Sequence, residues 1–586
     1  MDKQAGKWAL SDDWLALILG LVVFLLSLGV FGGIDILGWG IKTSTWMDPT
    51  KALSVASQNY APVKGEIVKI EGQKLTLKTA AGKEATVTVE AAAAAGLKVG
   101  DTFEKSGVTG IGALFYTFLA MLLLTTIGAV TLRANIPRFV IGFTVIFWLS
   151  YLCWFAGHYA HIAATKNDFA KYGISWSLSM TGEFGFIIAL VLGLLVGNFL
   201  PGVAEYLREA ARPELYIKTA IVIMGAGLGL KAAESLSLAS NIMFRGFCAI
   251  VEAYLIYWAL TYFIARRYFK FSREWSAPLA SGISICGVSA AIATGGAINA
   301  RPVVPIMVSS LIVIFVAVEM VILPFVAQFF MWQDPLVAGA WMGLAVKSDG
   351  GAVASGAITD ALIRAKALNM SGIKFAEGWI TMTTTTVKMF IDIFIGIWSF
   401  VLAVIWCTKI ECKAGQRVRA IEIWHRFPKF VLGYAGTFFL LLLLCWPASR
   451  AAGVATNEID TLNKQVATVS AQLTSATDAA KKAELEQQLA AAKGRITDLK
   501  AKAAIPEKTM KTAKAATGEG NVFRVLFFVL TFFTIGLVSN FKKLKQEGIG
   551  KLAAVYAVCL FGFIIWIGLF VSWLFFHGVL PPVLTS

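Results

Sequence analysis

Two glycine-rich stretches of this 586-residue chain carry the side chains best suited to chemistry. The first, SGISICGVSAAIATGGAINARP, runs from Ser281 to Pro302, and the second, GLAVKSDGGAVASGAITD, runs from Gly343 to Asp360. Both stretches lie within apolar sequence, yet the second contains the consecutive residues Lys-Ser-Asp-Gly-Gly. A charge at the centre of a bilayer is costly unless it faces protein or water. The stretches therefore predict a polar site that is buried inside a membrane protein.

The glycines of both stretches predict helices that are interrupted within the membrane. Each glycine in a helix interior costs about 1 kcal/mol relative to alanine, and irregular backbone at membrane depth is tolerated only where it is buried or lines a cavity. The N-terminus of a half-helix offers free N–H groups and a positive dipole end, which favour an anion. Tight helix packing is the alternative, but it does not explain Lys-Ser-Asp-Gly-Gly. Discontinuous helices of this kind are typical of secondary transporters.

We expect a small anion to bind between the two interrupted helices, in a polar cavity between Cys286 and Asp349. Hydroxyl, thiol and backbone groups would donate hydrogen bonds, and two lysines would offset the charge of the anion. The candidate substrate-binding residues are Ser284, Cys286, Gly287, Ser289, Lys347, Ser348, Gly350, Gly351 and Lys388.

Three carboxylates within apolar sequence are candidates for binding a coupling ion, either H⁺ or Na⁺. They are Asp349, Asp392 and Glu319, and a buried carboxylate either titrates or binds a cation. Lys388 and Asp392 are four residues apart and share one helix face, so a structural ion pair is the alternative. The seven cysteines show no zinc or redox spacing, and no nucleophile–base pair is recognisable. We expect no metal centre, no cofactor and no enzymatic activity.

The composition indicates that most of the chain is surrounded by lipid. Hydrophobic residues make up 57% and charged residues only 15%, against roughly 25% charged residues in a soluble domain. The net charge of +16 is attributed to cytoplasmic loops, where Lys and Arg accumulate, and not to nucleic-acid binding.

Apolar runs of about 20 residues predict about thirteen transmembrane helices. They lie near 14–33, 111–132, 139–162, 183–202, 215–232, 241–265, 277–299, 303–331, 335–357, 378–407, 428–448, 521–541 and 550–578.

Five basic clusters predict the orientation of these spans. With a cytoplasmic N-terminus, thirteen crossings would place every cluster in the cytoplasm and the C-terminus outside. The clusters are Arg133/Arg138, Arg208/Arg212, Arg266/Arg267/Lys270/Arg273, Lys409/Lys413/Arg417/Arg419/Arg426/Lys429 and Lys542/Lys543/Lys545/Lys551.

Two hydrophilic insertions would then lie outside the cell. The insertion at 34–110 alternates apolar and polar residues, with turns expected at Gly72 and 80–83, and predicts a small β module. The insertion at 449–520 carries two stripes of heptad-spaced apolar residues. It predicts an antiparallel helical hairpin that turns near 475–479 and ends at Pro506, because the chain must return to the membrane. An intermolecular coiled coil is the alternative, so a homo-oligomer or an envelope partner is expected at this hairpin.

Several segments together resemble the family of bacterial sulfate exporters. They are ALVLGLLVGNFLP at 189–201, GISICGVSAAIA at 282–293, WMGLAVKSDGGAVASGAITDA at 341–361, Lys388, and TIGLVSNFKKLKQEGI at 534–549. The resemblance covers about 183–448 and 521–580. It implies a bacterial inner-membrane transporter with a ten-span core of two inverted repeats, in which the seventh and twelfth spans correspond. The twelfth span would also be broken, at Gly536–Asn540.

The sequence departs from this family at the ninth span, where Lys347-Ser348 replaces a common pair of histidine and acidic residue. Ile391 also stands where an arginine often follows the lysine of the tenth span. These departures predict that the substrate can differ from that of typical members. The expected substrate is a small anion, either sulfate or an organosulfonate-like compound. A receptor or scaffold that binds a partner through its outer modules is the alternative function.

The sequence thus predicts an all-α membrane protein with two outer insertions. The expected segments are an N-terminal span at 1–33, the β module at 34–110, two accessory spans at 111–182, the first part of the transporter core at 183–448, the helical hairpin at 449–520, and the last two core spans at 521–586.

Overall fold

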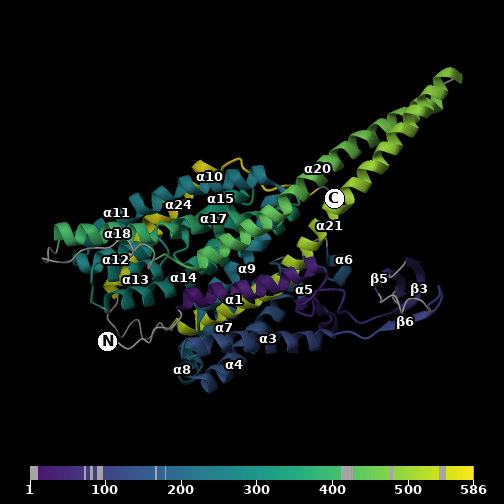
Figure 1. Ribbon diagram of the computed structural model, residues 1–586. Coiled ribbons are helices and arrows are strands. Elements are labelled where there is room, and N and C mark those ends of the chain that lie inside the picture. The colour runs from purple at the N-terminus through teal and green to yellow at the C-terminus, as the bar shows by residue number, and fades with distance from the viewer. Residues whose placement is uncertain are drawn as a thin grey trace.

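The computed structural model is an elongated helical molecule (Figure 1). Ten of the described helices are long and apolar enough to cross a membrane, and the number is eleven if the bent pair α7–α8 counts as one span. The described residues are 11–71, 74–79, 84–88, 97–164, 168–178, 180–301, 303–410, 424, 427–475, 479–539 and 550–584.

The membrane-spanning helices run along the molecule between its two ends (Figure 1). Short π-helical segments interrupt or extend three of them, at Ala253–Tyr257, Trp406–Ile410 and Leu560–Ile564. The spanning helices are α1 (Asp12–Ser27), α3 (Gly110–Thr131), α4 (Ile136–Gly157), α7 (Phe184–Phe199) with α8 (Pro201–Leu207), α9 (Pro213–Glu234), α10 (Leu236–Glu252) with α11 (Trp258–Arg267), α14 (Val303–Phe330), α17 (Trp379–Ile393) with α18 (Ile395–Ile405), α20 (Phe430–Ser475), α21 (Ala479–Val538), and α23 (Gly550–Cys559) with α24 (Ile565–Phe576).

The insertion after α1 contains two small antiparallel sheets. Strands β1 (Ile41–Thr43) and β2 (Leu53–Val55) pair with each other. The second sheet has the strand order β5-β4-β3-β6, and Ile67, Leu75 and Leu77 form its buried face. Its strands are β3 (Val63–Glu71), β4 (Lys74–Thr79), β5 (Glu84–Thr88) and β6 (Thr102–Lys105). The turns expected at Gly72 and 80–83 lie outside the described residues.

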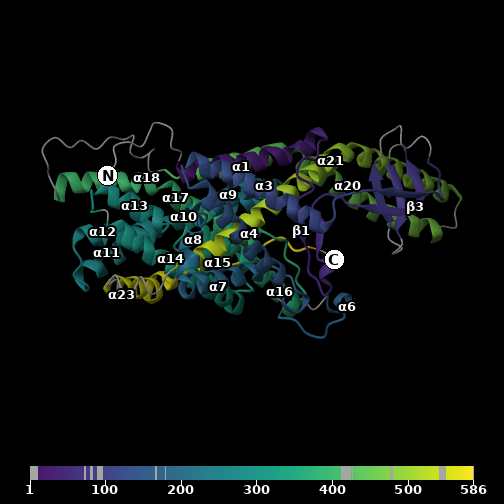
Figure 2. The same ribbon diagram turned by 90° about the horizontal axis from the view of Figure 1, so that it is seen from below.

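The second insertion is a helical hairpin formed by the distal halves of α20 and α21. The first arm ends at Ser475 and the second begins at Ala479, and Arg495 Nε donates to Glu458 Oε1 across the two arms at 2.8 Å. Figure 2 shows this hairpin and the four-stranded sheet at the same end of the molecule, with α11, α12, α13 and α18 at the other end. The two predicted outer insertions therefore lie on one side.

The expectation that Pro506 ends the second arm is wrong, because α21 continues through Pro506 to Val538. A proline removes one helical hydrogen bond and costs about 3 kcal/mol or more in a helix interior. Ala503, one turn before Pro506, is buried, and α21 packs against α20. The break expected at Gly536–Asn540 is also absent as far as Val538, and Asn540 lies outside the described residues.

The seventh predicted span is a helical hairpin and not a crossing. Its two arms are α12 (Arg273–Ser284) and α13 (Val288–Ala297), and each is too short to cross about 30 Å of hydrocarbon. Arg301, just beyond α13, binds Glu274 at the start of α12 with Nε–Oε1 at 3.0 Å. Thr294 on α13 also donates to Ser281 on α12 at 2.7 Å. The chain therefore returns to the end from which it entered.

The ninth predicted span is a second hairpin, which enters from the opposite end. Its arms are α15 (Pro335–Ala345) and α16 (Asp349–Ser371). Asp334, before α15, binds His577 at 3.0 Å, and Lys374, after α16, accepts a backbone bond from Leu584 at 2.8 Å. Both ends of the hairpin thus lie beside the C-terminal segment. The prediction of thirteen crossings is therefore corrected to ten or eleven spanning helices and two opposed hairpins.

The basic residues within the described chain that flank α3, α4, α8, α9 and α11 gather at the end opposite the outer hairpin. Asn135 donates its backbone N–H to Glu209, and Arg138 donates to the carbonyl of Tyr206, so the α3–α4 and α8–α9 connections lie together. With α7–α8 counted as one span, the eleven crossings are an odd number, as the predicted thirteen were. Assignment of this end to the cytoplasm stays a prediction. The residues Lys413, Arg417, Arg419, Arg426, Lys542, Lys543 and Lys545 lie outside the described chain.

Site-directed cysteines would test the two hairpins. We expect Lys270→Cys and Ala300→Cys to react with a membrane-impermeant thiol reagent from one face of the membrane, and Gln333→Cys and Ser371→Cys from the other. The parent protein supplies the background labelling of its own cysteines. Labelling of Lys270→Cys and Ala300→Cys from opposite faces would show that the seventh segment crosses the membrane, and would contradict the hairpin.

Candidate functional site

The tips of the two hairpins touch in the interior of the protein. Between α12 and α13 the chain unwinds at Ile285–Gly287, and between α15 and α16 it unwinds at Val346–Ser348. Gly287 has φ +77°, and a Cβ on it would lie 2.1 Å from the carbonyl oxygen of Lys347. Only glycine permits this conformation and this approach, which explains why a glycine occurs at this point of the sequence.

Lys388 of α17 joins the two tips. Its Nζ donates to the carbonyl of Ile285 at 2.8 Å and to the carbonyl of Val346 at 3.2 Å, and its side chain is fully buried. These carbonyls belong to the C-terminal ends of α12 and α15, which carry partial negative charge. The ammonium group therefore donates to one carbonyl of each hairpin that has no partner within its helix. It also offsets the partial negative charge at the two helix ends.

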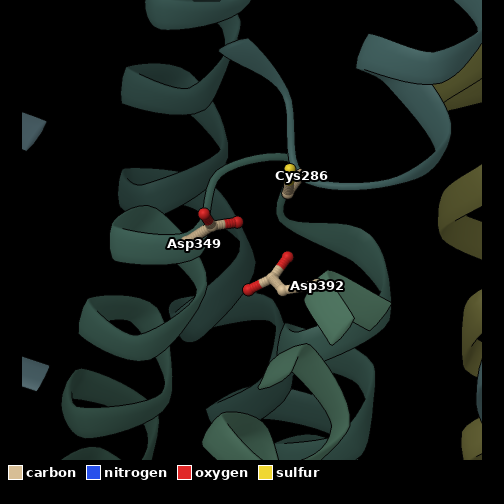
Figure 3. A group of neighbouring side chains, drawn as sticks. All are labelled: Cys286, Asp349 and Asp392. Atoms are coloured by element: carbon tan, nitrogen blue, oxygen red, sulfur yellow. The ribbon is translucent and has the colours of Figure 1, made fainter. Parts of the chain in front are cut away.

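A thiol and two carboxyl groups converge directly beside this bridge (Figure 3). Donor atoms of Cys286, Asp349 and Asp392 all lie within 4.8 Å of one another, and the three residues are 3%, 3% and 0% exposed. Both carboxylate oxygens of Asp392 lack a hydrogen-bond partner among the described residues, and so does Oδ1 of Asp349. The group can hold a positive charge, either a cation or a shared proton. The alternative, a direct ion pair between Lys388 and Asp392, is not formed in the described chain, because neither oxygen of Asp392 has a hydrogen-bond partner.

Glu319 of α14 holds the second tip from the other side. Its Oε2 accepts the backbone N–H of Lys347 at 2.8 Å, and its Oε1 accepts from the hydroxyl of Tyr556 at 3.3 Å. The ammonium group of Lys347 donates to the carbonyl of Leu344 and lies 4.6 Å from the ring centre of Tyr257. Glu319 thus positions the backbone of the tip, and Lys347 is held against its own hairpin and an aromatic face.

Three of the remaining candidates, Ser348, Gly350 and Gly351, have local structural roles. The Ser348 hydroxyl accepts from the N–H of Gly351 at 3.3 Å and caps α16. Gly350 and Gly351 allow close packing, because a Cβ would lie 2.3 Å from Ile217 and 2.7 Å from Val316, respectively. The hydroxyl of Ser284 is buried without a partner among the described residues, and Ser289 is half-buried on the first turn of α13. Their contact with a substrate stays a prediction.

Sequence reasoning did not assign two buried charged residues near this site. Lys218 of α9 binds Asp13 at 2.8 Å and Glu214 at 3.1 Å. The i,i+4 spacing of Glu214 and Lys218 predicts the second of these ion pairs. Glu252 is 4% exposed, and neither of its oxygens has a partner in the described chain. It immediately precedes the π-helical segment Ala253–Tyr257. Such segments often occur at functional sites, but no sequence pattern predicts them.

A cavity of about 120 Å³ lies further along α16, between α7, α9, α17 and α21. Its charged lining residues are Glu183, Lys231, Asp360, Arg364, Glu377 and Arg524. Arg364 binds Asp360 at 2.7 Å, and Asp360 also accepts from the N–H groups of Gly378 and Ile380 at the start of α17. Asp349 and Asp360 are about 16 Å apart along one helix. The cavity expected between the hairpin tips themselves stays a prediction.

The opposed hairpins and their buried charges define a multi-spanning membrane protein with an ionic site in its interior. Residues 169–489 match the family model described as conserved hypothetical protein 698. The chain belongs to this family, whose relatives are named UPF0324 membrane proteins.

The relatives come from bacteria and archaea. The chain is 36% identical over 584 residues to the UPF0324 membrane protein NE0724 of Nitrosomonas europaea, covering 100% of this chain and 99% of the relative. It is 42% identical over 203 residues to an uncharacterized protein of Archaeoglobus fulgidus, covering 35% of this chain and 88% of the relative. A UPF0324 membrane protein of Nitratidesulfovibrio vulgaris is 30% identical over 331 residues, covering 56% and 49%. No solved structure matches the chain.

Gly287→Ala tests the contact between the hairpin tips. We expect a large loss of folded protein, because the methyl group would meet the Lys347 carbonyl at 2.1 Å in a backbone conformation that disfavours alanine. Gly436→Ala on α20 is the matched control, since nothing lies within 4 Å of its Cβ position. Fluorescence-detected size-exclusion chromatography before and after heating measures the difference. Equal stability of the two variants would contradict the contact.

Proposed function

We propose that this protein is a secondary active transporter of a small anion, driven by movement of a coupling cation. The observation that supports this proposal most strongly is the contact between two hairpins that enter from opposite ends and meet over buried charges. Broken helices with facing backbone ends are characteristic of secondary transporters. Each hairpin separates the buried site from one side of the membrane, as alternating access requires.

The helices form two groups that could move against each other. The first hairpin packs with α11, α14 and α18, the second packs with α14, α17 and α24, and α10 packs with α17 and α24. The helices α1, α4, α7, α9, α20 and α21 pack with one another. Contacts between the groups include α9 with α10 and α16. In our proposal the hairpin group moves relative to the other group and carries the site between the two sides.

The charges around the tips support an anion with a coupling cation. Asp349 and Asp392 place negative charge beside Cys286, while Lys388 and the N-termini of α13 and α16 contribute positive charge. A cation or proton bound to the two carboxyl groups would lower the local negative charge. An anion would then bind more favourably, because the interaction between charges is strong in a buried site. Because binding of the anion depends on the bound cation or proton, the transport of the anion is coupled to that of the cation.

The cavity beside α16 is the proposed entrance for the anion. Lys231, Arg364 and Arg524 supply cationic groups, and α16 leads from this cavity to Asp349. The resemblance described above favours sulfate or an organosulfonate as substrate. The small hydroxyl and N–H groups near the tips suit an oxyanion, whose oxygens accept hydrogen bonds.

Uptake by liposomes containing the purified protein tests this function. We expect accumulation of ³⁵S-labelled sulfate or a labelled organosulfonate in response to an imposed ion gradient. Lys388→Ala or Asp349→Asn should abolish uptake, because each removes a charged group of the site. Exposed Lys409→Ala is the control and should retain wild-type uptake. Wild-type rates in both site variants would remove these residues from the transport site.

A receptor or scaffold is the second candidate function. It is favoured by the outer hairpin, whose arms project beyond the spanning helices on the same side as the β sheet (Figures 1 and 2). Such modules are not required for transport between the two sides of a membrane. They would bind an envelope partner or a second copy of the chain.

Shortening of the outer hairpin discriminates between the two functions. Residues 459–494 would be replaced by a short Gly-Ser linker, which retains the contact between Glu458 and Arg495 and the packing of Ala513 in the core. We expect unchanged uptake in liposomes, because the site lies among the other helices. Loss of uptake in a variant that elutes as a folded protein would assign the hairpin to the transport mechanism.

A further inference from the structure

The position occupied by the ammonium group of Lys388 is informative about the coupling ion. In secondary transporters, carbonyl oxygens at the ends of unwound helices coordinate the coupling Na⁺. Here one carbonyl from each hairpin, at Ile285 and Val346, accepts a hydrogen bond from Lys388 Nζ instead. The lysine is fully buried and covalently attached to α17, so its Nζ cannot leave the site as a bound ion can.

We propose that Lys388 is a tethered cation in the position of a coupling Na⁺, and that the ion coupled to transport is a proton shared by Asp349 and Asp392. This inference rests on the proposed transport function and specifies its energy source. The proton binds one carboxylate oxygen from water on one side of the membrane and leaves to water on the other side. Only the O–H bond forms and breaks.

The neighbouring donor set does not suit Na⁺. Hard cations prefer several oxygen ligands, whereas the group beside the tips consists of two carboxyl groups and the Cys286 thiol. The two backbone carbonyls that would complete an oxygen shell are bound to Lys388.

The same group suits a proton. Asp349 and Asp392 have oxygens within 4.8 Å of each other in a buried region, where two negative charges repel strongly. In the described chain neither oxygen of Asp392 receives a hydrogen bond that would stabilise its charge. A single proton shared by the pair removes this repulsion, as in other buried carboxylate pairs.

Among the charged groups around Asp349 and Asp392, Lys388 is the one that offsets the negative charge of this carboxyl pair. The titratable and charged groups that face the two aspartates are Cys286, Lys388, Lys218, Glu214 and Tyr254. Lys218 is already bound to Asp13 and Glu214, and the hydroxyl of Tyr254 donates to the carbonyl of Ile391. One proton on the aspartate pair leaves one negative charge, which the ammonium of Lys388 offsets.

Thermal unfolding of the purified full-length protein in NaCl and in choline chloride tests the first part of the proposal. We expect no Na⁺-specific change in the Tm of the wild type. Lys388→Ala should gain a Na⁺-dependent rise in Tm on the order of a few degrees, because Na⁺ can then bind between the two carbonyls and stabilise the folded state. Lys409→Ala is the control and should behave as the wild type. Na⁺-specific stabilisation of the wild type, or a folded Lys388→Ala without the gain, overturns the assignment.

Infrared difference spectroscopy over a pH series tests the second part, even if Lys388→Ala does not fold. The wild type should show a protonated-carboxyl band that titrates, and Asp392→Asn should lose it. Glu486→Gln, on the exposed face of the outer hairpin, should keep it. An unchanged band in both Asp349→Asn and Asp392→Asn overturns the shared proton. Neither measurement uses a transported substrate, so a protein that fails to transport the tested anions still reports on this proposal.

Discussion

The structure at the centre of this protein depends on hydrogen bonds to backbone carbonyls that water cannot reach. Where α12 and α15 end inside the molecule, their last carbonyls have no helical partner, and in a bilayer no water replaces it. Lys388 donates to one carbonyl from each hairpin. An unsatisfied buried acceptor costs about 1–3 kcal/mol, so this single side chain stabilises both breaks. The contact between Gly287 and Lys347 depends on the same arrangement.

A reciprocal pattern of support surrounds the bridge. The helix that follows the first hairpin, α14, supplies Glu319, which accepts from the backbone of the second tip. The helix that follows the second hairpin, α17, supplies Lys388, which donates to the backbone of the first tip. Each hairpin is thus held by the spanning helix that follows the other hairpin. The inverted repeat, with the seventh and twelfth spans as counterparts, stays a prediction.

The sequence predicted the interruptions of the central helices better than the topology around them. The run Lys347–Gly351 and the glycines near Cys286 correctly indicated interrupted helices, because charge and glycine are costly in a membrane helix. Hydropathy could not distinguish a hairpin from a crossing, since two short apolar arms add up to the length of one span. The decisive contact joins Glu274 to Arg301, residues that look like ordinary loop charges. The partners of Lys388 are backbone atoms, which no residue pattern reveals.

The meeting of two opposed hairpins at Lys388 can be tested with a cryo-EM map of the full-length protein in lipid nanodiscs, at a resolution that shows side chains. We expect breaks in helical density at 285–287 and 346–348, with the Lys388 Nζ between the carbonyls of Ile285 and Val346. Continuous helices through both segments, or a Lys388 side chain directed away from them, would contradict it.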